Sequence, residues 1–272
     1  RNRPEHIRDS EKEVLNYNKA ILELDNLIKE KKLLFNLNLI VRIQKIITSG
    51  LIEKYRSGHI RKEPVFVNDP KTRKTVYWPP GHKEAPSLLK ELLNYLKKNS
   101  QVIDPLISAG IFHKQFVIIH PFVDGNGRTA RILTKTLLAK MGLDTFNLFS
   151  FENYYNQNVS KYFANVGIIG NYYDIKDKID FTAWLEYFTD GIIDELLRVK
   201  KELEKEIISP DIKDHHKLIL NYIKEKGYIT DKDYSALAKR AKPTRNLDFN
   251  KLIDLGFIIR IGKGRATYYK LR

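Results

Sequence analysis

The amino-acid sequence predicts a mainly α-helical protein with one large domain and one small C-terminal domain. Apolar residues recur every three or four positions over most of the first two hundred residues, which is typical of amphipathic helices. A single short region of this part, residues 64–80, is rich in β-forming residues. A charged helical stretch then ends near Ser209-Pro210-Asp211, and a basic segment follows it. We therefore expect domains over residues 1–208 and 209–272.

The predicted helices of the large domain follow the apolar periodicity. They cover residues 11–31, 34–55, 87–98, 103–119, 129–140, 159–166 and 181–207. Within residues 64–80, two β-rich runs, Val65-Phe66-Val67 and Thr75-Val76-Tyr77-Trp78, lie on either side of the turn residues Asn68-Asp69-Pro70. This order predicts a β-hairpin.

Composition excludes several classes of protein. The 272 residues are 42% hydrophobic and 30% charged, which excludes a disordered or low-complexity chain. The sequence has no cysteine, so disulfide scaffolds, thiolate zinc sites and cysteine nucleophiles are excluded as well. It contains no run of about 20 apolar residues and no charged-apolar leader. We therefore expect a cytoplasmic protein that does not bind a membrane.

The chain is strongly basic. It has 48 Lys and Arg against 33 Asp and Glu, a formal net charge of +15. Residues 210–272 hold 15 basic and 7 acidic residues, so this short segment carries +8 of the total. A basic surface favours anionic partners such as nucleotides, nucleic acids or acidic proteins. The alternative is a soluble protein with a lysine-rich face.

The C-terminal segment has the order of elements found in a winged helix-turn-helix domain. Three short helices are predicted, over residues 215–226, after Thr230, and from Pro243 to the residue before Gly256. Two strands joined by a glycine turn follow. A recognition helix with a basic wing suits duplex DNA, although winged helices also serve as dimerisation or protein-docking modules. The expected DNA contacts are Thr244, Arg245, Lys263 and Arg265.

The most informative segment runs from His120 to Arg131 and connects two predicted helices. Pro121 disfavours helical geometry at the preceding residue, so His120 is expected at a helix end, facing a loop. Gly125 and Gly127 allow the backbone to turn several N–H groups in one direction. At a helix N-terminus this arrangement binds anions, because the unpaired amides and the positive end of the helix dipole both face the ligand.

The charged residues of this segment complete a site for a metal and a polyphosphate. Arg128 and Arg131 are three residues apart, so they share a helix face and can bind phosphate oxygens. Asp124 offers a hard oxygen ligand to Mg²⁺. His120 titrates near neutrality and can act as a base. Each feature alone has a structural explanation, such as a turn or a solvated helix face, and only their combination points to a site.

The segment resembles the signature of the Fic family, His-Pro-Phe-x-Asp-Gly-Asn-Gly-Arg-x-x-Arg, at every fixed position from His120 to Arg131. Supporting resemblance extends through Asn16-Tyr17, residues 57–61, Tyr77-Trp78-Pro79-Pro80 and residues 181–184, and the tail resembles the winged helix that is often fused to Fic domains. The resemblance implies a Fic-type helical bundle with a β-hairpin flap. It also implies transfer of AMP from ATP, with Mg²⁺, to a Ser, Thr or Tyr hydroxyl of a protein.

The same resemblance implies roles for individual residues. His120 is the general base, Asp124 holds Mg²⁺, and Phe122 fixes the loop in the core. The nucleotide is bound by Gly125, Asn126, Gly127, Arg128 and Arg131. Asn158 and Tyr162 match positions on the adenine side, where the family has Asn-Arg and this chain has Asn158-Val159. The hairpin, through Val65, Phe66, Val67, Val76 and Tyr77, is the flap that holds a target segment by strand addition.

The inhibitory motif of many Fic proteins, Ser/Thr-x-x-x-Glu-Gly/Asn, is not found in the sequence, so we expect an unrestrained protein that modifies itself. Alternatives remain open. The chain could be a DNA-binding regulator that uses the Fic fold as a nucleotide sensor, or it could transfer or remove another nucleotidyl group. The phosphate-transferring type differs at the positions of Gly127 and Arg128, which argues against it. A homodimer is also left open.

Overall fold

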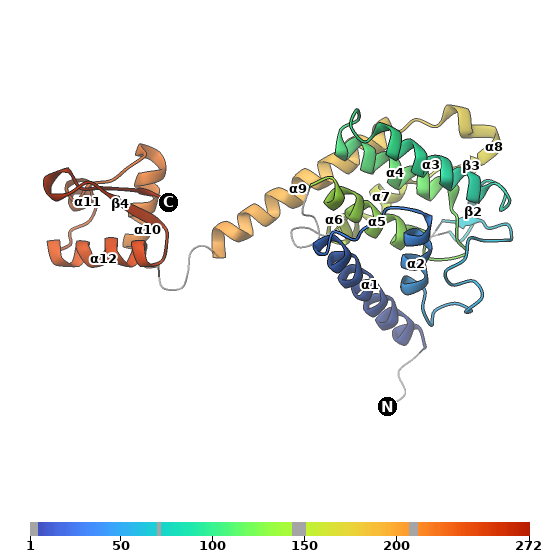
Figure 1. Cartoon of the computed structure of the whole chain (residues 1–272), viewed down its shortest axis with the longest axis horizontal. Coiled ribbons are helices and arrows are strands. Elements are labelled where there is room, and N and C mark those ends of the chain that lie inside the picture. The colour runs from blue at the N-terminus through green and yellow to red at the C-terminus, as the bar shows by residue number, and fades with distance from the viewer. Residues whose placement is uncertain (1–4, 70–71, 143–150, 207–211) are drawn as a thin grey trace. The chain divides into compact units, whose positions relative to one another are not determined.

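The structure, a computed structural model, describes residues 5–69, 72–142, 151–206 and 212–272 (Figure 1). It is mainly helical, which confirms the predicted fold class, and it divides into two compact units, residues 1–200 and 201–272. The domain boundary that we predict, between residues 208 and 209, lies outside the described residues. None of the helices in the described ranges has the length and apolarity needed to cross a membrane.

The first unit is built from helices and one small sheet. Its helices are α1 (Glu5–Lys29), α2 (Leu37–Ile47), α3 (Ala85–Asn99), α4 (Pro105–Ile119), α5 (Asn126–Lys140), α6 (Phe151–Gln157), α7 (Val159–Val166), α8 (Tyr172–Ile175), the 3₁₀ helix Lys176–Lys178, and α9 (Thr182–Glu206), which runs into the second unit.

Helix α4 lies at the centre of this unit. It begins at a cap, where the Asp104 carboxylate accepts from the Leu106 amide and Pro105 occupies the first turn. Residues on several sides of α4 are buried, among them Phe112, Phe116 and Ile119, because α3, α5 and α9 all pack against it. A helix that is apolar on most sides belongs in a core rather than at a surface.

A buried histidine joins α4 to its neighbours. His113 Nε2 lies 3.2 Å from the Tyr162 hydroxyl of α7, and Nδ1 lies 3.2 Å from Thr134 Oγ1 of α5. Trp184 of α9 stacks near the same ring and donates from Nε1 to the Gly110 carbonyl, at 2.8 Å. Burial lowers the pKa of His113 to about 3, so the ring is neutral at pH 7. The side chains of His113, Thr134, Tyr162 and Trp184 thus find hydrogen-bond partners between helices.

Helix α2 ends earlier than the sequence predicts, at Ile47 instead of residue 55. The amide and the hydroxyl of Thr48 both donate to the Gln44 carbonyl, and Gly50 has a φ of +68°. The helix ends for two reasons, although the apolar pattern continues beyond it. The Thr48 hydroxyl competes for one of the last carbonyls, and Gly50 adopts a left-handed conformation.

The sheet has the order β1-β2-β3, with β1 (Val67–Asn68), β2 (Thr75–Trp78) and β3 (Gly170–Asn171). Strands β1 and β2 are antiparallel, while β3 pairs with β2 in parallel, with Tyr77 opposite Gly170. The sequence analysis does not predict β3, because two residues carry no detectable alternation. Tyr77 is buried and donates to the Ile118 carbonyl at 2.9 Å, which fixes the sheet to the end of α4.

The second unit contains three helices followed by an antiparallel strand pair. These elements are α10 (Asp214–Lys226), α11 (Asp231–Leu237), α12 (Lys242–Asp254), β4 (Ile258–Ile261), the 3₁₀ helix Gly264–Ala266 and β5 (Tyr268–Leu271). Its core joins α12 to the strands, because the Phe249 ring stacks on Tyr269 with centroids 4.0 Å apart. This order of elements is the one that the sequence predicts.

The close approach of α4 and α9 depends on Gly110. A Cβ at this position would lie 2.6 Å from Leu185 Cδ2 and 3.1 Å from Phe188 Cδ1. We predict that Gly110→Val lowers the free energy of unfolding by about 1–3 kcal/mol, because overpacking forces the helices apart. Adding Leu185→Ala makes room, so the double variant should be more stable than the sum of the two single effects. Urea unfolding of the four proteins measures this, and strict additivity would contradict the proposed contact.

Candidate active site

The candidate active site is the loop between α4 and α5, which begins at His120. This residue is the C-cap of α4 and has φ 48° and ψ 60°, a left-handed conformation that is uncommon outside glycine. Arg61 holds the loop in place. Its buried guanidinium donates to the His120 carbonyl at 2.7 Å and to the Ile119 carbonyl at 3.4 Å, and its amide donates to the Pro121 carbonyl.

The side chain of His120 is half-buried and oriented by its own helix. Nδ1 lies 3.2 Å from the Val117 carbonyl and donates to it, so Nε2 carries the lone pair. Burial lowers the pKa of His120 to about 4, although the Val117 bond acts in the opposite direction. The ring is therefore neutral at pH 7, with Nε2 able to accept a proton.

Asn126 and Phe122 close the loop into a compact turn. The Phe122 amide donates to Asn126 Oδ1 at 3.0 Å, and Asn126 Nδ2 donates back to the Phe122 carbonyl at 2.8 Å. The Phe122 ring is fully buried and packs near Phe116. The structure therefore gives the buried Asn126 side chain, which we expect to contact nucleotide, a role in bracing the loop.

The first turn of α5 forms the predicted amide nest. Gly125 is its N-cap, with φ +80°, and a Cβ there would lie 2.9 Å from Thr48 Cγ2. The next three amides, at residues 126–128, have no acceptor within the helix, as at any helix N-terminus. Gln44 Nε2 donates to the Asp124 carbonyl at 3.1 Å, so α2 helps to position the nest. The loop that begins at His120 thus ends in an electropositive backbone.

Two carboxylates already face the first arginine. Arg128 donates from one nitrogen to Asp124 Oδ2 at 2.8 Å and lies 3.1 Å from Glu13 Oε1 of α1. The sequence analysis does not predict this contact of Glu13, since 115 positions separate it from Arg128 and no local pattern marks it. The second arginine, Arg131, is half-buried, and a Cβ on Gly127 would lie 3.5 Å from its guanidinium. Both guanidiniums therefore lie close to the glycines of the nest.

The structure gives other predicted nucleotide contacts structural roles. Asn158 is exposed and caps α7 by accepting from the Lys161 amide. Tyr162 is buried, with its hydroxyl at His113 and its ring stacked on Tyr155. Neither residue is brought into the loop by a described contact.

The predicted flap is only partly available for docking. Tyr77 lies in the central strand, and its backbone is paired on both sides, so it cannot accept another strand. Val76 lies in the same strand, half-buried. In the hairpin, the strand whose outer edge is unpaired among the described strands is β1. Its Val67 is half-buried. Before β1, Phe66 is exposed and Val65 is half-buried. The exposed edge that we expect to hold a target segment is therefore at β1, and the docking itself stays a prediction.

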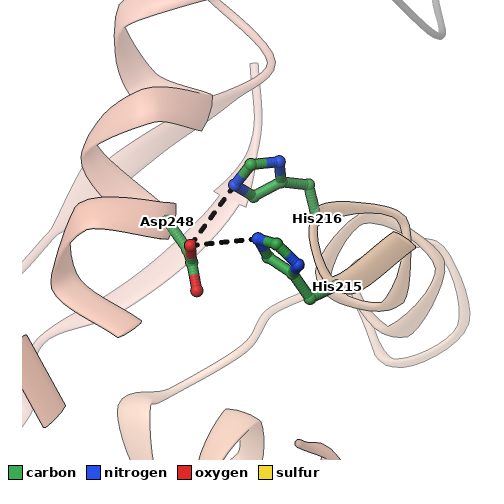
Figure 2. A group of neighbouring side chains, drawn as sticks. All are labelled: His215, His216 and Asp248. Atoms are coloured by element: carbon green, nitrogen blue, oxygen red, sulfur yellow. Dashed lines mark ion pairs between the residues drawn. The ribbon is translucent and has the colours of Figure 1, made fainter. Parts of the chain in front are cut away.

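In the second unit, His215 and His216 both point toward Asp248 (Figure 2). Their Nε2 atoms lie 3.2 and 3.4 Å from Asp248 Oδ1. Adjacent residues on a helix usually point apart, whereas these two rings converge on one carboxylate oxygen. The three residues could in principle ligate a metal. However, His216 Nδ1 accepts from the Lys213 amide, which places the ring hydrogen on Nε2, where it points to the carboxylate.

Further donors show that Asp248 is the centre of a hydrogen-bond network. Tyr234 donates to Oδ2 at 2.8 Å, and Arg240 donates to both oxygens, at 2.7 and 3.1 Å. A carboxylate with this many donors is satisfied without a cation. The network ties α10, α11 and α12 together.

The side chains that we expect to contact DNA differ in their exposure and in their bonds within the unit. Arg245 donates to both oxygens of Asp231, at 2.8 and 2.7 Å, and to the Arg240 carbonyl. Its guanidinium is therefore committed inside the unit, which corrects the expectation that it faces DNA. Thr244 is half-buried and Lys263 is exposed. The side chain of Arg265 lies outside the described residues.

Comparison with known proteins identifies the large unit. Residues 34–138 match the model of the Fic/DOC family. This region of the chain is therefore similar to the domains of that family. The matched region includes α4, the whole loop and most of α5, so it contains the candidate site.

Curated relatives of the Fic domain are similar over part of the chain. A protein adenylyltransferase Fic of Nematostella vectensis is 32% identical over 146 residues, covering 48% of this chain and 30% of that protein. A probable protein adenylyltransferase of Aquifex aeolicus is 32% identical over 126 residues, covering 45% and 39%. The chain thus spans about a third of the length of these two relatives.

Solved structures support the fold. A Fic family protein from Desulfovibrio desulfuricans has a TM-score of 0.56 at 18% identity, covering all of this chain and 77% of that one. Fic-1 from C. elegans has a TM-score of 0.57 at 19% identity, covering 73% and 53%.

We predict that Glu13→Gln strengthens binding of a triphosphate anion, because Glu13 competes for Arg128. The Glu13 side chain is 50% exposed, so the ion pair is partly screened and its loss should raise affinity by up to about five-fold. Isothermal titration with inorganic triphosphate measures this. Glu11→Gln, on the same helix, is the matched control and should bind like the unmodified protein. An unchanged affinity in Glu13→Gln would show that the pair does not compete with the anion.

Proposed function

We propose that this chain transfers AMP from ATP to a Ser, Thr or Tyr hydroxyl of a protein, itself included. The observation that carries the proposal is the composition of one short loop: it begins at a neutral imidazole with a free Nε2 and ends at a helix N-terminus with two guanidiniums near its glycines. The names of the curated relatives, protein adenylyltransferases, support the same reaction.

The proposed reaction uses these groups in one step. The hydroxyl oxygen attacks the α-phosphorus of ATP and forms the new ester bond, while its proton passes to His120 Nε2. The bond from the α-phosphorus to the bridging oxygen breaks, and pyrophosphate leaves. The α5 amides and the guanidiniums of Arg128 and Arg131 face the phosphates and stabilise the charge that develops there. In this family of reactions positioning and charge stabilisation provide most of the catalysis, and the base assists.

Asp124 is the residue that would hold Mg²⁺. One carboxylate oxygen of Asp124 accepts from Arg128, and no described hydrogen bond reaches the other oxygen. The side chain is 46% exposed. Such a carboxylate suits Mg²⁺, which binds through few carboxylates and the substrate phosphates. When bound, the metal would neutralise charge on the polyphosphate.

We predict that His120→Ala abolishes AMP transfer while ATP still binds. Loss of a general base lowers the rate by about 10²–10⁴-fold, whereas the nest and arginines remain. Mass spectrometry after incubation with ATP and Mg²⁺ measures added AMP, and a fluorescent ATP analogue measures binding. His82→Ala, a histidine outside the loop, is the control. Near-normal transfer by His120→Ala would refute the role of the base. Absence of added AMP on the protein without substitutions would count against self-modification.

We also propose that residues 212–272 bind duplex DNA. The order of three helices and a strand pair matches a winged helix, and the segment is rich in exposed cations, including Lys239, Lys242 and Lys263. The alternative, a regulator in which the Fic domain only senses nucleotide, is less well supported, because a sensor does not need a base with a free Nε2.

We predict that DNA binding by the full chain weakens steeply as salt rises, because phosphate contacts release counterions. Lys242→Ala and Lys263→Ala should each lower the slope of log affinity against log salt by about 1. Lys97→Ala, on α3 of the first unit, should leave the slope unchanged. Fluorescence anisotropy with a labelled duplex of arbitrary sequence provides the measurement. Affinity that does not depend on salt would exclude binding through phosphates.

A further inference from the structure

One face of α12 is exposed and polar. Its side chains at positions 246, 247 and 250 lie on one stripe, while Asp248, Phe249 and Leu252 are buried in the core of the unit. Leu247 is 66% exposed, so the stripe is not covered within the unit. This is an outward face with two amides and one apolar side chain between them.

The hydrogen-bonding capacity of this stripe is unused. Within residues 212–272, neither Asn246 nor Asn250 has a side-chain hydrogen bond. The nearby guanidiniums, in contrast, are committed: Arg245 to Asp231, and Arg240 to Asp248. These pairs orient α12 on α11 but remove both arginines from outward recognition. The polar groups that this stripe of α12 offers to a partner are therefore carboxamides.

Charge indicates a polyanionic partner for this face. Exposed Lys239 and Lys242 stand at the start of α12, and the strand pair and its turn carry exposed Arg260, Lys263 and Lys270. The acidic side chains of the unit are largely paired internally, as for Asp231 and Asp248, and Asp254 lies at the far end of the helix. A polar helix face bordered by cations is complementary to a DNA groove bordered by phosphates.

We infer that α12 enters the major groove of duplex DNA and that Asn246 and Asn250 recognise adenine. A carboxamide forms two bonds with this base, accepting from N6 and donating to N7, and the exposed Leu247 lies between them to contact a thymine methyl group. Arginine contacts to guanine from α12 are excluded by the pairing of Arg245. The site therefore favours A·T pairs. This inference rests on the DNA binding proposed above.

The test uses the full chain and a randomised duplex library. Repeated selection should enrich sequences with A·T pairs in the central positions. Asn246→Ala and Asn250→Ala should each lower the preference for the enriched duplex over one with G·C substitutions by about 5- to 150-fold, the range for one bidentate base contact. Affinity for an arbitrary duplex should change little. Asn221→Ala, an exposed amide on α10, is the matched control and should keep the preference.

The outcomes separate the two proposals. Binding to DNA with no A·T preference, or a preference that survives both substitutions, overturns adenine recognition and leaves DNA binding intact. Failure to bind any duplex, with capture of single-stranded RNA or of a second copy of the chain instead, overturns both. Thermal unfolding followed by circular dichroism should be unchanged in the two variants, because both side chains are exposed.

Discussion

The geometry of the loop between α4 and α5 depends on how the end of α4 is satisfied. A helix leaves its last carbonyls without partners, and here they would be buried at the point where the chain must turn sharply. The Arg61 guanidinium, itself buried, donates to two of them, which allows His120 to adopt a left-handed conformation and the loop to turn directly into α5. The strained residue is also the base that we propose, so the bonds that stabilise the turn also orient the imidazole.

The loop carries both positive and negative side chains, so it is not a purely cationic site. Arg128 faces Asp124 and Glu13, so the positive field of the nest is partly neutralised before any ligand arrives. Under the proposed function, a phosphate that binds Arg128 would exchange with a carboxylate, so the free energy of binding would be the difference between two ion pairs rather than the value of one. Helix α1 therefore contributes a negative charge, that of Glu13, to the candidate site, although the backbone of the loop comes from other parts of the chain.

Sequence patterns predict this fold and site unequally. The segment from His120 to Arg131 is informative because its residues are close in sequence and their spacing fixes their relative positions on one turn and one helix. Glu13, Gln44 and Arg61 act on the same loop from distant positions, and only tertiary packing brings them there. Arg245 shows the opposite error, since a basic residue on a recognition helix suggests a DNA contact until its pair with Asp231 is known. Residues 170–171 form a strand too short for any periodicity to reveal.

Strand β3 joins two distant parts of the sequence in one small sheet. It ties the hairpin to the segment between α7 and α9, and Tyr173 just beyond it donates to Glu84 and accepts from the Gly81 amide. The platform beside the loop is thus assembled from two stretches of chain almost a hundred residues apart. Residues 167–180 supply one side of this platform and none of the loop residues. Under the proposed function, substitutions there would change how a target polypeptide is held, while the groups that carry the chemistry stay the same.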